Sequence, residues 1–308
     1  MTRFLQSAIA GLGNGSTYAL VALGFVIIYK STLVVSFAQP ALMVAGITVL
    51  VYLTGYLGVP ASGSADGSFA MFYVAVIVAM VFTALLGLAV ERVALRPMIG
   101  RPVFVVAIIT IGVDIILRIG VNRFLGRNVR PIGDPWGLST FDVGGVFIQQ
   151  RHVVMITTTA VVVAALFAFF KYSRIGLAMR ATAFDQEAAL AMGVSVGQVF
   201  ALSWMIAGAL AALAGTFVGT GAGIDQGTWV VALKALPAVI LGGLDSVGGA
   251  VVGGLVIGVV EQLFATYQGT YAPWLGQNFA VVSPYVVLLV VLLVRPYGLF
   301  GTPEIERV

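Results

Sequence analysis

The feature that most constrains this chain is a series of nine apolar runs, most of them long, with polar connections between them. A helix needs about 20 apolar residues to cross the hydrocarbon core of a bilayer, where its backbone groups must bond to one another. Only 9% of the residues are charged and 60% are apolar, which leaves too few polar side chains for a soluble surface. The sequence therefore predicts an all-α polytopic membrane protein and excludes a soluble enzyme, a disordered chain and a nucleic-acid binder.

The number of membrane segments depends on how the seventh and eighth runs are arranged. Both are short, and Gly242, Gly243, Gly248 and Gly249 lie between them. They form either two spans or one crossing with a re-entrant, glycine-broken segment. We therefore expect eight or nine membrane segments in a single domain that covers residues 1–308. The runs are residues 5–29, 33–57, 69–90, 103–119, 153–170, 199–218, 229–241, 250–264 and 281–294.

The residue types that most enzymes use for catalysis are sparse or absent. The chain has no cysteine, and His152 is its single histidine, so a disulfide and a multi-histidine metal site are both excluded. None of the lysines follows a glycine, so the chain lacks a phosphate-binding P-loop. We expect no enzymatic activity, no metal and no cofactor, and any driving energy must come from a partner.

A polar stretch at about residues 171–197 predicts a short helix between two spans. Thr182, followed three residues later by Asp185, resembles a capping box and predicts that the helix begins there. Gly193 is expected to end this helix in a left-handed conformation. Considered as a helix pattern alone, the segment is a solvated interfacial helix.

The distribution of Lys and Arg predicts the orientation in the membrane. If the loop at residues 171–197 is cytoplasmic, alternation of the spans places the larger share of these residues in the cytoplasm. The N-terminus is then outside and the C-terminus is cytoplasmic. The longest polar connection, at about residues 120–151, is external. Within it, apolar residues alternate around Gly144-Gly145, which predicts a β-hairpin.

The residues Glu187-Ala188-Ala189, with Gly193 four positions after Ala189, resemble the EAA-x-x-x-G loop of bacterial ABC importer permeases. In that family, a short cytoplasmic helix docks into a groove on an ATP-binding subunit and transmits its closure. The resemblance implies that this segment couples the chain to an ATPase. The residues implied are Arg180, Thr182, Asp185, Glu187, Ala188, Ala189 and Gly193.

Four further stretches, residues 15–46, 91–102, 236–264 and 291–301, together resemble the permeases of branched-chain amino acid ABC importers. The likeness is greatest to the shorter, LIV-type subunit. It implies a second permease subunit, two ATP-binding subunits and an extracytoplasmic solute-binding protein, assembled in the inner membrane of a bacterial cell around a small-molecule substrate. A urea or short-amide importer is the alternative within this class, and an autonomous secondary carrier or channel is the alternative from another class.

The segment Ser36-Phe37-Ala38-Gln39-Pro40 departs from the Asn-Phe-Ala-His-like stretch that is common in this family. Proline forces a helix break, and broken helices in membranes are tolerated where they are buried in protein or line a cavity. By analogy with discontinuous transporter helices, we expect Ser36, Phe37, Gln39 and Pro40 to line the substrate pathway. A simple loop between the first two spans is the alternative reading.

A second break, which includes Gly242, Gly243, Asp245 and Ser246, is its expected counterpart on the pathway. Glycines expose backbone groups that can bond to a passing solute. They also allow membrane helices to approach closely, so close helix packing is an equal alternative.

Charged residues within the apolar runs are candidate functional residues. Asp114 and Arg118 are four residues apart, which favours an ion pair within one helix. Lys234 and Glu261 have no partner that their spacing supplies. Either could border the pathway, extend to the membrane interface or pair with a residue of another helix.

Arg123, Arg127 and Arg130 recur on the external loop. Solute-binding proteins of such importers commonly carry acidic residues on the face that they present to the permease. We therefore identify these arginines as candidate docking residues, with lipid head groups as the alternative partner.

Overall fold

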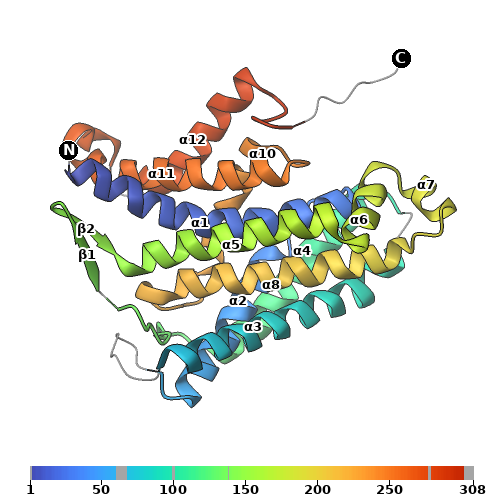
Figure 1. Cartoon of the computed structure of the whole chain (residues 1–308), viewed down its shortest axis with the longest axis horizontal. Coiled ribbons are helices and arrows are strands. Elements are labelled where there is room, and N and C mark those ends of the chain that lie inside the picture. The colour runs from blue at the N-terminus through green and yellow to red at the C-terminus, as the bar shows by residue number, and fades with distance from the viewer. Residues whose placement is uncertain (1, 60–67, 99–100, 138, 277–278, 302–308) are drawn as a thin grey trace.

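The computed structural model describes residues 2–59, 68–98, 101–137, 139–276 and 279–301, which form a bundle of long helices along one common axis (Figure 1). In this part of the chain, seven helices are long and apolar enough to cross a membrane. Two shorter apolar stretches, Trp229–Gly242 and Phe279–Val294, bring the membrane segments to nine, within the range expected. The prediction of an all-α polytopic membrane protein is therefore confirmed.

The elements follow the apolar runs closely. In chain order they are α1 (Thr2–Thr32), α2 (Gln39–Tyr56), α3 (Ser68–Val90), the π-helix η1 (Glu91–Leu95), the 3₁₀ helix η2 (Arg96–Met98), α4 (Val103–Leu125), β1 (Thr140–Val143), β2 (Val146–Gln149), α5 (Gln150–Tyr172), α6 (Arg174–Phe184), α7 (Gln186–Ala191), α8 (Val196–Ala222), α9 (Trp229–Leu233), α10 (Ala235–Gly242), α11 (Val247–Tyr271), the 3₁₀ helix η3 (Pro273–Leu275) and α12 (Phe279–Val294).

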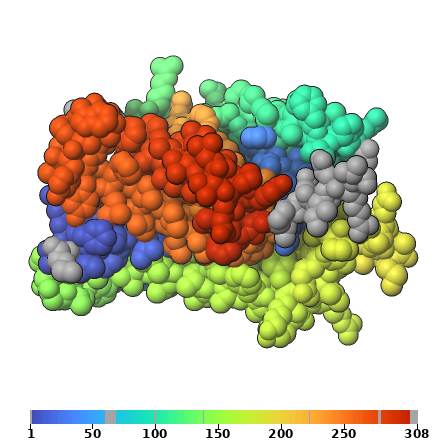
Figure 2. All heavy atoms as spheres, turned by 90° about the horizontal axis from the view of Figure 1, so that it is seen from above, coloured from blue at the N-terminus to red at the C-terminus, as the bar shows by residue number. Residues whose placement is uncertain are grey.

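The helix α1 lies at the centre of the bundle. In its most apolar 18-residue stretch, 89% of the residues are buried, against 11% in the corresponding stretches of α4 and α5. The helices α4 and α5 therefore present most of their surface outward, as lipid-facing helices do. In the space-filling view, α11 and α12 lie between α5 and α4 on the face seen from above (Figure 2).

The contact between α1 and α11 depends on glycines. A Cβ placed on Gly258 would overlap the backbone of Gly15, and one placed on Gly254 would overlap the backbone of Ala19. Without an apolar driving force between helices in lipid, such close backbone approach supplies the van der Waals contact that joins them.

We expect Gly258→Val to reduce sharply the amount of folded protein, because the added side chain has no space between two backbones. Overpacking of this kind costs about 1–3 kcal/mol, and more where the neighbour is backbone. Gly269→Val is the matched control on the same helix, since a Cβ at Gly269 meets nothing within 4 Å. The yield of monodisperse protein in detergent measures both, and equal yields would contradict the role of this contact.

The glycine-rich break between the seventh and eighth runs is a turn between two separate helices. The helix α10 ends at Gly242 and α11 begins at Val247. Gly243, at φ 104°, adopts a backbone conformation that L side chains rarely take. The two helices pack against each other, with the backbones of Gly242 and Gly249 in direct contact. Of the two arrangements left open, two spans or one crossing with a re-entrant segment, the structure has in either case a short helix followed by a long one.

The strands β1 and β2 form an antiparallel hairpin beside the N-terminal end of α5. Val143 pairs with Val146 across the turn, and Gly144 and Gly145 take φ of 63° and 82°. This is the position that the alternating pattern predicts. Positive φ at both central residues matches the twist of the flanking strands, which is why two glycines occupy the turn.

Candidate functional site

The helices α6 and α7 project from one end of the bundle, and the N-terminus and the hairpin lie at the other end (Figure 1). Asp185 ends α6 and begins α7, with an extended backbone at φ −156°. Its Oδ1 accepts hydrogen bonds from the amides of Glu187 at 2.9 Å and Ala188 at 3.0 Å. This side-chain cap satisfies two amides that the first turn of a helix leaves free.

The start of this helix corrects the capping-box prediction. Thr182 lies inside α6, is buried, and donates from Oγ1 to the Ala178 carbonyl at 2.9 Å. It therefore caps nothing, and Asp185 performs that function instead. The predicted end is confirmed, because Gly193 follows α7 with φ 83°.

The segment from Phe184 to Gly193, which we call the α7 tip, exposes several large apolar side chains. Phe184 is 95% exposed and Met192 is 85% exposed. Glu187, Ala188 and Gly193 are also exposed, whereas Ala189 is buried against the bundle. Arg180 is exposed on α6. An exposed apolar patch with a polar rim is the usual mark of a protein interaction site.

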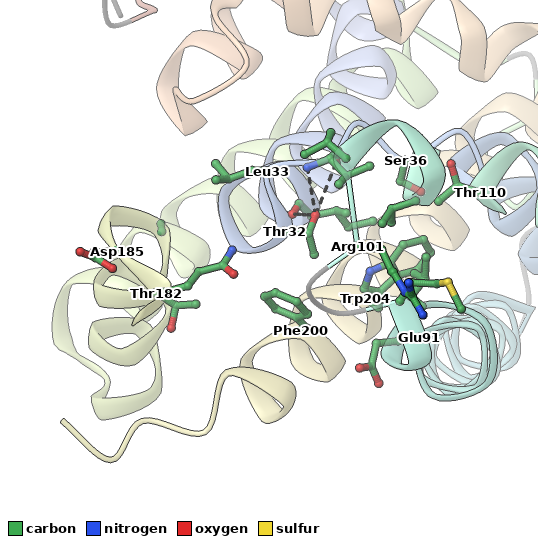
Figure 3. Close-up of a pocket in the computed structure, with 18 of the residues that line it drawn as sticks. Thr32, Leu33, Ser36, Glu91, Arg101, Thr110, Thr182, Asp185, Phe200 and Trp204 are labelled. Atoms are coloured by element: carbon green, nitrogen blue, oxygen red, sulfur yellow. Dashed lines mark hydrogen bonds between the residues drawn. The ribbon is translucent and has the colours of Figure 1, made fainter. Parts of the chain in front are cut away.

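A cavity of about 500 Å³ connects the α7 tip with the interior of the bundle, and we call it the α7-side cavity. Figure 3 shows Thr182 and Asp185 on one side and Glu91 and Arg101 on the other. Further labelled lining residues are Thr32, Leu33, Ser36, Thr110, Phe200 and Trp204.

The loop between α1 and α2 forms part of this cavity. Ser36 is completely buried and lines the cavity, and the amide of Phe37 donates to Thr110 Oγ1 at 3.1 Å. Gln39 turns away from the cavity and donates from Nε2 to the Ala207 carbonyl at 3.1 Å. Ala207 lies 11 residues (207 − 196) after the start of α8, or about 16 Å along its axis. The break before α2 therefore lies well inside the bundle.

Of the first group of predicted pathway residues, the structure places only Ser36 on the α7-side cavity. Gln39 and Pro40 are completely or almost completely buried among helices. Pro40 occupies the first turn of α2, where its missing N–H removes no helical hydrogen bond. The proline therefore starts a helix and does not kink one.

The second group lies elsewhere, and the structure does not bring it to Ser36. Gly242 accepts a hydrogen bond from the Phe300 amide at 3.1 Å, and Ser246 caps α11 by accepting from the Gly249 amide at 3.0 Å. Asp245 and Ser246 line a different hollow of about 540 Å³, beside Lys30, Lys171 and Arg180. For Gly242 and Gly243, these contacts support the alternative of close helix packing.

Glu91 is a cavity residue that sequence reasoning did not single out for a role of its own. It is completely buried at the start of the π-helix η1, with its Oε1 at 3.3 Å from Arg96 Nε. Arg96 in turn donates from Nη2 to the Gly197 carbonyl at 2.9 Å. No group among the described residues donates a hydrogen bond to Oε2 of Glu91. Short π-helical turns often occur at functional sites, and an acid at the end of an apolar run was the available signal.

The three external arginines have different surroundings. Arg123 and Arg127 are exposed near the end of α4. Arg130 donates from Nε to the Leu125 carbonyl at 2.7 Å, and its guanidinium lies 5.2 Å from the centre of the Tyr52 ring. Arg130 is therefore held by contacts within the fold, whereas Arg123 and Arg127 are exposed and accessible to a partner.

The charges within the apolar segments are paired. Asp114 Oδ2 lies 2.7 Å from Arg118 Nη2, which confirms the pair predicted from their spacing. Lys234 Nζ lies 2.6 Å from Glu261 Oε1, so α11 and the junction between α9 and α10 are joined by an ion pair. Of the open readings for these two residues, the structure supports pairing across helices.

Comparison with solved structures gives one similarity at the level of the whole bundle. A chain of "PsaBC from Streptococcus pneumoniae in complex with Fab" matches over 96% of this chain and 92% of that chain, with a TM-score of 0.48 and 15% identity.

Comparison with curated sequences gives similarities over the full length. The chain is 31% identical over 313 residues to the "High-affinity branched-chain amino acid transport system permease protein LivH" of Salmonella typhimurium, covering 99% of this chain and 98% of the relative. It is also 31% identical over 316 residues to the corresponding protein BraD of Pseudomonas aeruginosa, with the same coverage. The family model described as "Branched-chain amino acid transport system / permease component" matches residues 7–294. By these matches the chain belongs to the family of branched-chain amino acid transport permease components.

Proposed function

We propose that this chain is the membrane permease subunit of an ATP-driven importer that carries branched-chain amino acids or a related small polar solute. The observation that carries the proposal is the α7 tip, where a short, side-chain-capped helix exposes Phe184 and Met192 next to a cavity into the bundle. The expected partners are a second permease subunit, two ATP-binding subunits and an extracytoplasmic solute-binding protein.

The proposed orientation puts the α7 tip in the cytoplasm of a bacterial cell and the N-terminus and hairpin outside the inner membrane. Lys30, Lys171 and Arg180 line one hollow at the α7 end of the bundle, which supports this orientation because cytoplasmic loops are enriched in basic residues. The C-terminus is then cytoplasmic as well.

In this mechanism, closure of the ATPases displaces the α7 tip, and the displacement reaches the interior along two connections. One connection is the wall of the α7-side cavity, which includes Thr182 of α6 and Ser36 of the loop before α2. The other is the contact from Glu91 through Arg96 to Gly197, at the start of α8. Motion at α7 thereby changes the surroundings of the break before α2, where we propose that solute passes.

Two alternatives make different predictions. A urea or short-amide importer would have the same coupling segment and a different solute. An autonomous secondary carrier would transport without partners, and the exposed apolar residues of the α7 tip would have no function in it.

The decisive experiment is uptake in proteoliposomes by this chain assembled with the proposed second permease subunit, ATP-binding subunits and solute-binding protein. We expect ATP-dependent uptake of radiolabelled leucine, isoleucine or valine. Uptake of urea in place of these amino acids would identify the alternative importer. Uptake by this chain alone, without ATP, would overturn the proposal in favour of a carrier.

We expect Arg123→Gln combined with Arg127→Gln to lower uptake at limiting binding protein, because complementary charge raises the rate of encounter. Both residues are exposed, so the substitutions leave the fold intact. Raising the salt concentration should slow wild-type uptake and affect the variant less, since exposed charges are screened over about 10 Å at 0.1 M salt. The same salt dependence in both proteins would contradict docking and leave lipid head groups as the partners of these arginines.

A further inference from the structure

A second polar cavity, of about 440 Å³, lies toward the end of the bundle that carries the hairpin. It shares no lining residue with the α7-side cavity. Its walls come from α1, α5, α8, α11, α12 and the junction of α9 with α10. Its volume is within the range of pockets that bind small molecules, about 300–1,000 Å³. We call it the Arg151 cavity, after the arginine in its wall.

Each carboxylate oxygen of Glu261, the acidic residue in this cavity, has a partner. Glu261 accepts from the Tyr18 hydroxyl through Oε2 at 2.6 Å and pairs through Oε1 with Lys234 at 2.6 Å. Asn14 donates to the side chain of the neighbouring Gln262 at 3.2 Å. The charge of Lys234 is therefore neutralised by Glu261, and this network adds no net charge to the cavity.

Arg151 is different, because its charge is not neutralised. Its Nη1 donates to the Thr220 carbonyl at 3.2 Å, and no group in the described part of the chain accepts a hydrogen bond from its buried Nε. Among the residues that the structure describes, no carboxylate lies within ion-pair distance of this guanidinium. The cavity consequently has an uncompensated positive charge, with donors left over for an anion.

The backbone around Arg151 is arranged to leave room for the guanidinium. Near its end, α8 departs from helical geometry at Thr220, with ψ 126°, and at Gly221, with φ 96°. A Cβ on Gly221 would overlap the guanidinium of Arg151. Helices that are interrupted at a buried charge are a recurrent feature of transporter binding sites.

Apart from Thr17, the remaining wall of the cavity is apolar and includes Met155, Phe217 and Val231. A ligand that suits this cavity has a carboxylate for Arg151 and an aliphatic part for these side chains. We propose that the Arg151 cavity binds a small aliphatic carboxylate, such as the carboxylate end of an aliphatic amino acid, with Arg151 as the anchor. The identification with an imported amino acid rests on the proposed function, whereas the preference for a carboxylate does not.

The test compares two probes of the same shape, 4-methylpentanoate and its neutral amide. Binding is measured calorimetrically to the assembled transporter in nanodiscs, without the solute-binding protein. We expect the wild type to bind the carboxylate at least about tenfold more tightly than the amide, since a charge-assisted, forked contact is lost with the amide.

The variants separate an anchor from a structural residue. Arg151→Gln should bind both probes with equal, weak affinity. Arg151→Lys should keep part of the preference for the carboxylate, because lysine retains the charge but lacks the paired N–H donors of the guanidinium. Arg3→Gln, an exposed arginine at the same end, is the matched control and should behave as wild type. Thermal unfolding without ligand checks that each variant is folded.

Three outcomes would overturn the proposal: no binding of the carboxylate by the wild type, equal binding of both probes, or an unchanged preference in Arg151→Gln. Leucine uptake by the complete importer is measured in parallel. A carboxylate preference without leucine uptake would refute only the assignment of leucine as the imported solute, and leucine uptake without the preference would refute only the Arg151 cavity.

Discussion

The double variant Phe184→Asp, Met192→Asp is expected to lose nearly all ATP-driven uptake while reaching the membrane in normal amounts. Both side chains are at least 85% exposed, so their replacement removes almost no contact within this chain. In a complex they would enter the groove of an ATP-binding subunit, and buried apolar anchors of this kind contribute several kcal/mol to an interface. The measurement is ATP-dependent uptake in proteoliposomes, normalised to the amount of inserted protein.

The control for this variant is Phe184→Leu with Met192→Leu, which keeps the apolar surface and should retain uptake. Glu187→Lys, an exposed charge reversal on the same helix, should also reduce coupling. Gly193→Val is a less direct test of docking. At φ 83° a valine strains the backbone, so this variant could lose uptake without any change in docking. Normal uptake by the aspartate variant would refute the assignment of the α7 tip as the coupling surface.

A second large effect is expected at the ion pair of Lys234 and Glu261. Glu261→Leu leaves the largely buried Lys234 ammonium without its counter-ion, and such a change costs about 3–5 kcal/mol. The double variant Lys234→Leu, Glu261→Leu removes both charges and should recover most of the lost stability. Tyr18→Phe, which removes only one hydrogen bond to Glu261, should cost about 1 kcal/mol.

Thermal unfolding in detergent measures these three variants on one scale. The decisive comparison is between the single and the double leucine variant. If the double variant is as unstable as Glu261→Leu alone, the loss comes from side-chain packing and the ion pair has no special role.

Features set by neighbours in sequence could be predicted from the sequence. The hairpin around Gly144-Gly145 and the pair of Asp114 with Arg118 depend on local spacing, and both are present. The start of α7 was misplaced because Thr182 and Asp185 both suit an N-cap. Ser173, which accepts from the Gly176 amide at 2.8 Å, begins α6 early enough to enclose Thr182 within that helix.

Features that depend on packing between distant segments could not be predicted from local sequence patterns. Lys234 and Glu261 are 27 residues apart, and only the packing of α10 against α11 brings them together. The α7-side cavity similarly joins Ser36 and Glu91 to α6, and no periodicity indicates which polar residues meet there. The α8 break at Thr220 and Gly221 lies just after the apolar run at residues 199–218, and the glycines around it gave no distinct signal.

The contact between α3 and α8 has a mechanical consequence. A Cβ on Gly87 would overlap the Trp204 carbonyl, and one on Gly208 would overlap the Thr83 carbonyl, so the two backbones touch at two successive turns. Side chains between packed helices can adjust by changing rotamers, but touching backbones have no such freedom. We therefore expect the two helices to shift as one rigid pair. Because α8 begins three residues after Gly193, the displacement that we propose at α7 would carry α3 with it, and so reach a largely exposed helix without any helix bending.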